Sequence, residues 1–182
     1  MIYIVLADGF EEVEALTPYN LMRRAGLNVK LVALDSMKPR GCTLALGVEC
    51  DITMQQALES EDKIELLMFP GGMPGAANCD SHPLTDALIN KAIADGAYLA
   101  AICAAPMIFG KRGLLSGKRA TAFPSFREYL EGAVVCDKEK VCTDGRFITA
   151  AGMGAAFEFG IEILRALCSE QVAMSIKERV QG

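Results

Sequence analysis

The stretch Ala97-Tyr98-Leu99-Ala100-Ala101-Ile102-Cys103-Ala104-Ala105-Pro106 decides how this sequence folds. An apolar run of this length after Gly96 is typical of a buried parallel strand. Pro106 favours the first turn of a helix, where its missing N–H would have had no partner. Cys103 is therefore expected where a strand turns sharply into a helix, in the manner of a nucleophile elbow with sulfur in place of a serine oxygen. The alternative is an inert core cysteine, since free cysteine is among the most buried residue types.

Apolar runs of strand length alternate with helical patterns along the rest of the chain. Further strands are expected at residues 2–7, 28–34, 64–69 and 118–122, with a hairpin around Asp144-Gly145. This alternation predicts an α/β fold in which helices cover both faces of a mostly parallel sheet. Ligands of such folds bind beyond the carboxyl ends of the strands. Asp8-Gly9, Gly71-Gly72 and Cys103 follow strands and are expected to converge there.

Two stretches in the first third of the chain are less regular. A helix that is closed by Gly26 begins either at Pro18, with Thr17 as its N-cap, or near Glu11 with a kink at Pro18. Apolar and other side chains alternate over residues 42–50, which predicts an extended ribbon with one apolar face. Later helices are expected after Pro83, over residues 157–168 and over residues 172–180.

The composition limits the class of protein. A chain of 182 residues, 52% of them hydrophobic, is expected to form one globular domain over residues 1–182. Lys and Arg number 18 against 23 Asp and Glu, without a basic cluster, which argues against a nucleic-acid partner. No apolar stretch approaches the ~20 residues of a membrane span, and no basic signal-peptide start is present. We therefore expect a cytoplasmic protein with no membrane partner.

The seven cysteines are expected to be free thiols, because disulfides are rare in reducing compartments. The chain contains no C-x-x-C pair and a single histidine, His82. This composition argues against a structural zinc site, and no metal ligands are assigned.

Five stretches, taken in order and spacing, resemble the ThiJ/PfpI family of the class I glutamine-amidotransferase-like superfamily. They are Asp8-Gly9-Phe10-Glu11-Glu12-Val13-Glu14, Met22-Arg23-Arg24-Ala25-Gly26, Phe69-Pro70-Gly71-Gly72, Ala101-Ile102-Cys103-Ala104-Ala105-Pro106 and Ala151-Gly152-Met153-Gly154-Ala155-Ala156-Phe157-Glu158-Phe159. The sequence looks most similar to the branch that contains the parkinsonism-associated deglycase. This resemblance implies a flavodoxin-like three-layer sandwich and a homodimer, with residues 42–50 and the helix bearing Glu14 as candidate contact surfaces.

The resemblance also implies roles for particular residues. Cys103 is similar to the family's reactive cysteine, Glu14 to the acidic residue against its sulfur, and Gly71, Gly72 and Ala104 to the residues whose amides form an anion hole.

Departures from the family pattern argue against a peptidase. Peptidase members have histidine directly after the cysteine, where this chain has Ala104, and several relatives have histidine where Phe123 stands before Pro124. Met153 also replaces a proline that is common in the glycine-rich stretch.

Without a histidine, the thiol needs another source of activation. An ordinary cysteine, with a pKa of about 8.5, is only a few per cent thiolate at neutral pH. A helix N-terminus lowers that pKa by roughly one unit. A neutral Glu14 carboxyl, held in that form by burial, would add a hydrogen bond of about 1.5–3 kcal/mol to the thiolate. Glu11 and Glu12 are expected only to complement a helix N-terminus, which is the simpler alternative for Glu14 as well.

Two functions from different classes fit these residues. In the first, Cys103 attacks the aldehyde of a 2-oxoaldehyde such as methylglyoxal or glyoxal, Glu14 shuttles a proton between neighbouring carbons, and water releases a hydroxy acid. The same chemistry applies to early glycation adducts, so this protein would be a glyoxalase or deglycase of hydrolase/lyase type. In the second, oxidation of Cys103 serves an oxidative-stress sensor or chaperone without turnover. A cysteine peptidase is a distant third. None of these functions requires a metal or organic cofactor.

Overall fold

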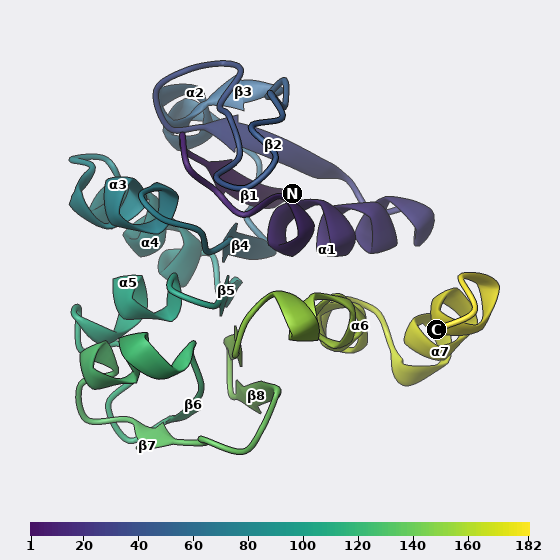
Figure 1. Ribbon diagram of the computed structural model, residues 1–182. Coiled ribbons are helices and arrows are strands. Elements are labelled where there is room, and N and C mark those ends of the chain that lie inside the picture. Colours follow the sequence, from purple (N-terminus) through teal and green to yellow (C-terminus); the bar gives the residue numbers. More distant parts are fainter.

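The computed structural model describes residues 1–182 and is built on a seven-stranded sheet in the order β3-β2-β1-β4-β5-β9-β8 (Figure 1). The strands are β1 (Ile2–Leu6), β2 (Val29–Ala33), β3 (Ile52–Thr53), β4 (Leu66–Phe69), β5 (Tyr98–Ile102), β8 (Val141–Asp144) and β9 (Phe147–Ala150). Every neighbouring pair is parallel except β8 and β9, which form the hairpin predicted at Asp144-Gly145. A separate small sheet pairs β6 (Arg119–Ala120) with β7 (Val134–Val135). The predicted mostly parallel sheet is thus confirmed.

Helices lie on both faces of the large sheet and complete three layers (Figure 1). One face carries α1 (Glu12–Arg24), α6 (Ala156–Leu167) and α7 (Glu170–Arg179). The other carries α2 (Met54–Glu59), α3 (Gly75–Ser81), α4 (Thr85–Ala94), α5 (Pro106–Gly110) and the 3-10 helix η1 (Pro124–Tyr129). A second 3-10 helix, η2 (Met153–Ala155), leads into α6. None of the helices is both long enough and apolar enough to cross a bilayer.

Both faces of the sheet are buried because side chains alternate between them along each strand. In β1, Ile4 and Leu6 pack toward α1 and α6, whereas Tyr3 and Val5 pack toward α4 and α5. All four side chains are fully buried or nearly so. This is why the strands read as continuous apolar runs in the sequence.

The first helix resolves the choice left open by the sequence. α1 begins at Glu12, and Glu11 is its N-cap, because the Glu11 carboxylate accepts the backbone N–H of Glu14 at 2.7 Å. Pro18 lies inside the helix. The start near Glu11 is therefore correct, and it places Glu14 in the first turn.

The ribbon predicted over residues 42–50 is wrong. This segment is a loop that folds back on itself, since the Gly41 N–H donates to the Leu46 carbonyl at 3.0 Å and Ala45 has a φ of +56°. The apolar alternation does not line a buried face, because Leu44 and Leu46 are both exposed. Chain reversal within six residues is incompatible with an extended ribbon, and the periodicity was coincidental.

Two short helices affect the surroundings of Cys103. α3 was not predicted, because its sequence Gly75-Ala76-Ala77-Asn78-Cys79-Asp80-Ser81 has no apolar periodicity. The helix after Cys103, α5, is short, because it has only five residues and ends at Gly110. Pro106 is its first residue, as predicted.

Candidate active site

Cys103 lies directly after β5 in a backbone conformation that is unusual for a residue with a side chain. Its φ is +64°, whereas non-glycine residues rarely have positive φ. The turn is fixed on both sides, since the Cys103 N–H donates to Ala150 of β9 at 2.9 Å and the Ala105 N–H donates to Ile102 at 3.1 Å. Strain of this kind costs about 1–3 kcal/mol and clusters at functional sites. The geometry is that of the predicted elbow.

Glu14 reaches this cysteine from the first turn of α1. Its side chain is only 1% exposed, and its Oε2 atom accepts the Gly71 N–H at 3.0 Å. The carboxyl group also shares a hydrogen bond with the Cys103 thiol. Burial raises the pKa of Glu14 to about 7, and this effect outweighs the hydrogen bonds from Cys103 and Gly71, which lower it. At neutral pH the carboxyl is therefore protonated in a large fraction of molecules.

The Cys103 thiol does not have the lowered pKa expected from the sequence. Burial and the neighbouring Glu14 carboxylate raise its pKa to about 12, although backbone N–H groups of Ala104 and Gly72 act in the opposite direction. The expectation relied on a helix dipole, but α5 starts three residues beyond Cys103 and is only five residues long. A helix this short contributes little at that distance.

Together, Glu14 and Cys103 behave as a pair that holds a single proton from about pH 7 to about pH 12. The pair loses its first proton near pH 7 and its second near pH 12, so it carries one negative charge between these values. That charge resides either on the carboxylate or on the sulfur. A thiolate forms when the proton resides on Glu14, which then donates its hydrogen bond to the sulfur.

The three backbone amides predicted to form an anion hole divide between two groups. Those of Gly72 and Ala104 face the Cys103 sulfur. That of Gly71 instead donates to Glu14. Gly71 also leaves no room for a side chain, since a Cβ atom there would lie 2.5 Å from Glu14 Oε2 and 2.6 Å from Cys103 Cβ. The Gly71 N–H thus holds the Glu14 carboxyl group in place.

The ends of the three strands meet as expected from the topology. A Cβ atom on Gly72, whose φ is +87°, would lie 2.5 Å from the carbonyl oxygen of Gly9. The Asp8 carboxylate accepts the Arg40 N–H at 2.8 Å. Asp8 therefore anchors a loop rather than taking part in the site.

Gly152 and Phe123 lie beside the Cys103 sulfur, although the sequence did not predict a place in the site for either residue. A Cβ atom on Gly152 would lie 3.4 Å from the Phe123 ring and 4.0 Å from Cys103 Sγ, so all three lie together. The Phe123 N–H donates to the Cys103 carbonyl at 2.9 Å. Phe123 is 46% exposed, so this apolar edge of the site is open to solvent. The glycine-rich stretch around Gly152 was the available signal.

The single histidine does not take part in the site. His82 ends α3, where its Nδ1 accepts the Leu84 N–H at 3.2 Å and its Nε2 lies 3.7 Å from the Asp35 carboxylate. The Cys103 thiol therefore has no imidazole partner. A group of three metal-ligating side chains, Cys136, Glu139 and Cys142, lies outside the site as well.

Glu12 has a structural role that the sequence did not indicate. Its buried carboxylate accepts the N–H groups of Leu44 at 2.7 Å and Thr43 at 3.3 Å. Burial opposes ionisation, but these backbone hydrogen bonds lower the pKa of Glu12. Gly41 makes room for the carboxylate, because a Cβ atom there would lie 2.0 Å from Glu12 Cδ. Glu12 thus fixes the loop that replaces the predicted ribbon.

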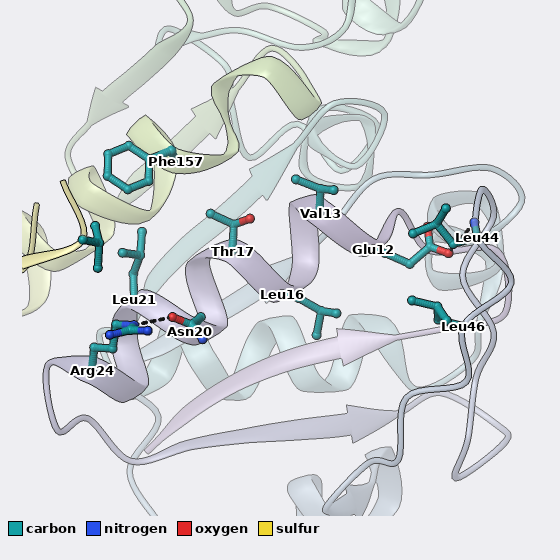
Figure 2. Close-up of a pocket in the computed structure, with 11 residues that line it drawn as sticks. Glu12, Val13, Leu16, Thr17, Asn20, Leu21, Arg24, Leu44, Leu46 and Phe157 are labelled. Carbon is teal, nitrogen blue, oxygen red and sulfur yellow. Dashed lines mark hydrogen bonds between the residues drawn. The ribbon is translucent and has the colours of Figure 1, made fainter. Parts of the chain in front are cut away.

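An apolar groove runs along α1 and does not contain Cys103 (Figure 2). Val13 and Leu16 of α1, Leu44 and Leu46 of the loop, and Phe157 of α6 line it. Glu14 is not among the residues that line the groove. α1 therefore contributes to two different features, the cysteine site and this groove.

Comparisons of the sequence and the structure with known proteins match members of one family. A sequence model of the DJ-1/PfpI family matches residues 1–166. The protein dj-1beta of Drosophila melanogaster is 30% identical over 174 residues, which cover 95% of this chain and 92% of the relative. The glutathione-independent glyoxalase DJR-1.2 of Caenorhabditis elegans is 26% identical over 157 residues, which cover 86% and 82%. The structure of oxidized Toxoplasma gondii DJ-1 superposes with a TM-score of 0.91 at 27% identity and covers 99% of this chain and 97% of that one.

Proposed function

The chain belongs to the DJ-1/PfpI family, and on this premise we propose that it is a cysteine-dependent glyoxalase or deglycase. Its substrates would be small 2-oxoaldehydes, such as methylglyoxal and glyoxal, or the early glycation adducts that they form. The observation that carries the proposal is the buried Glu14 carboxyl against the Cys103 sulfur, on a strained turn. Similarity to a relative named as a glutathione-independent glyoxalase adds support.

The first step uses both members of the pair. With the proton on Glu14, the Cys103 thiolate attacks the aldehyde carbon of methylglyoxal and forms the carbon–sulfur bond of a hemithioacetal. The aldehyde oxygen becomes an alkoxide and takes the proton from Glu14, which is left as a carboxylate. The amides of Gly72 and Ala104, which face the sulfur, are suited to stabilise negative charge that develops beside it.

The second step moves a proton between two carbons. The Glu14 carboxylate removes the hydrogen from the former aldehyde carbon as a proton and leaves an enediolate. The enediolate takes that proton back at the neighbouring carbon, while the hydroxyl proton moves from the first oxygen to the second. The product is a lactoyl thioester on Cys103. Water then adds to the thioester carbonyl, the carbon–sulfur bond breaks, and lactate leaves with the thiol restored. The sum is methylglyoxal plus water giving lactate and a proton. One carbon is oxidised and its neighbour is reduced, so no external oxidant or reductant is needed.

The test is lactate formation from methylglyoxal in the absence of glutathione. The parent protein is expected to turn over, and Cys103→Ser is expected to abolish turnover. Cys168→Ser is a matched control, because Cys168 is an exposed free thiol on a different part of the fold and should leave turnover unchanged. Lactate production that persists in Cys103→Ser would refute the proposal.

The same site supports a second candidate function, that of a peroxide sensor. The thiolate attacks the peroxide oxygen, water leaves, and the sulfur becomes a sulfenate; a second peroxide gives the sulfinate. The amides of Gly72 and Ala104 would stabilise either anion. Similarity to a DJ-1 structure determined in an oxidized form is consistent with this function. Oxidation of Cys103 in a protein that has no aldehyde turnover would favour the sensor.

We also propose that the protein is a homodimer. The groove along α1 exposes apolar side chains, among them Val13, Leu44 and Leu46, which are 40%, 62% and 51% exposed. Contiguous exposed apolar surface of this kind is typical of an interface. Sedimentation equilibrium at micromolar concentration tests this proposal, and a monomer mass would contradict it.

A further inference from the structure

Two cysteines and a glutamate that the chemistry at Cys103 does not use lie close together elsewhere in the fold. They are Cys136, Glu139 and Cys142, spaced as C-x-x-E-x-x-C in the sequence. One ligand atom from each, the two Sγ atoms and a carboxylate oxygen, lies within 4.8 Å of the other two. The composition argued against a structural zinc site, because the motif expected of a thiolate metal site is C-x-x-C.

The two sulfur atoms are positioned by different strands. Cys142 lies in β8, faces Thr149 across the hairpin and is only 2% exposed. Cys136 directly follows β7, where its N–H donates to Ala120 of β6 at 2.8 Å. Glu139 lies in the turn between them, and its Oε2 accepts a hydrogen bond from Cys142 Sγ at 3.5 Å. The backbone thus fixes both thiols, and an exposed turn supplies the carboxylate.

We propose that Cys136, Glu139 and Cys142 form a binding site for a divalent thiophilic cation of the zinc type, with water in the fourth position. Thiolate sulfur and carboxylate oxygen are both ligands that zinc accepts in a tetrahedral site. Tetrahedral zinc with bonds of about 2.3 Å to sulfur places two sulfur atoms roughly 3.8 Å apart. Ligand atoms that already lie within 4.8 Å of one another need to move by ~1 Å or less to reach that geometry.

The charge around the group favours a divalent ion. Two thiolates and one carboxylate carry three negative charges, and a divalent cation reduces this to one. Arg119 supplies the remaining positive charge, because its guanidinium group forms an ion pair with Glu139 and a hydrogen bond with Cys136. The backbone N–H of Arg119 is itself held by the Asp144 carboxylate at 2.9 Å. Arg119 thus serves as an outer partner that orients the ligands and leaves the loaded site neutral.

The experiment is a Co²⁺ titration of the full chain under a non-coordinating phosphine reductant. It is carried out in a Cys103→Ser background, which removes the thiol of the other cysteine–carboxylate pair. We expect one equivalent of Co²⁺ to give thiolate charge-transfer bands and the visible bands of tetrahedral cobalt, and one equivalent of Zn²⁺ to remove both. Absence of these bands would overturn the proposal.

Variants identify the ligands. Cys136→Ser, at a half-buried position, is expected to weaken Co²⁺ binding by more than ~100-fold, since outer partners alone are worth ~10–100-fold. Glu139→Gln removes the charge of a direct ligand and should therefore weaken binding by at least as much as loss of an outer partner, ~10–100-fold. Cys168→Ser, an exposed thiol outside the group, is the matched control and should bind as the parent does.

A measurement of stability guards against misfolded variants. Zn²⁺ should raise the midpoint of thermal unfolding of the parent but not of Cys136→Ser, because only a protein that binds the ion in its folded state is stabilised. Cobalt bands that persist in Cys136→Ser, or a Cys136–Cys142 disulfide that survives the reductant, would overturn the proposal.

Discussion

Replacement of Glu14 by glutamine should change how the stability of the fold depends on pH. Burial raises the pKa of Glu14 from 4.5 to about 7. Between these values the folded protein holds a proton that the unfolded chain has lost, so the free energy of unfolding falls as pH rises. Glutamine has nearly the same shape, can still accept the Gly71 N–H and has no charge to bury. Glu14→Gln should therefore lose this part of the pH dependence.

The size of the effect follows from the two pKa values. One pKa unit corresponds to about 1.36 kcal/mol. With 4.5 for the unfolded chain and about 7 for the fold, ionisation of Glu14 costs about 1 kcal/mol at pH 5 and about 3 kcal/mol at pH 8. The stability of Glu14→Gln relative to the parent should consequently rise by roughly 2 kcal/mol between these pH values.

Urea unfolding at pH 5 and pH 8 measures this difference. With a slope of about 2 kcal/mol per molar urea, the change corresponds to a midpoint shift of ~1 M. Glu12→Gln is a matched control on the same helix turn. Backbone hydrogen bonds lower the pKa of Glu12, so the stability that its carboxylate contributes is lost only as the pH falls below about 4.5. The Glu12→Gln difference should be the same at pH 5 and pH 8. If the Glu14→Gln difference is also constant, Glu14 is an ordinary carboxylate and the proposed proton shuttle fails.

Three further predictions concern the site and the groove. Gly71→Ala should abolish methylglyoxal turnover and destabilise the fold by ~1–3 kcal/mol in urea unfolding, because a Cβ there would lie 2.5 Å from Glu14 Oε2. Gly154→Ala is the control, because a Cβ at Gly154 meets open space and should leave the free energy of unfolding almost unchanged. The rate of Cys103 alkylation should rise near pH 7 in the parent but not in Glu14→Gln or Glu14→Leu. The Cys103 pKa should be ~1–2 units lower in the glutamine variant than in the leucine variant, since only the amide can donate to the thiolate. Identical pH profiles of alkylation for the two variants would contradict this. Leu46→Glu should convert a dimer to a monomer in light scattering, because Leu46 is exposed in the groove on α1. The helix content measured by circular dichroism should not fall. An unchanged mass would exclude this face as the interface.

The sequence predicted the layers of the fold well, since they depend on local patterns. Buried parallel strands are apolar throughout, and α1, α5 and the β8–β9 hairpin carry cap, proline and turn signals. The error at residues 42–50 has a physical cause. Glu12, about 30 residues earlier in the chain, binds the backbone of Thr43 and Leu44, and no local pattern reveals such a contact.

The site was predictable as a set of residues but less so as a set of interactions. Strand ends must meet at one edge of a parallel sheet, so the proximity of Cys103 to Gly71-Gly72 followed from topology. The direction of each amide did not, because it depends on the φ of Gly72 and on the orientation of the Glu14 side chain. The Cys136–Glu139–Cys142 group was missed because its two cysteines lie in or next to strands of two different sheets.

The structure changes how activation of the thiol has to be explained. A lowered cysteine pKa needs a nearby positive charge or a long helix pointing at the sulfur. Cys103 has neither, since α5 has five residues and the single histidine, His82, is engaged with Asp35. The reactive form must instead arise by transfer of a proton within the pair, from sulfur to Glu14. Such a mechanism works best when the carboxyl titrates near the operating pH, and a Glu14 pKa of about 7 meets that condition. In the proposed mechanism, burial of the glutamate takes the place of the imidazole of a cysteine peptidase, and it would also provide a base of suitable strength for moving a proton between carbons.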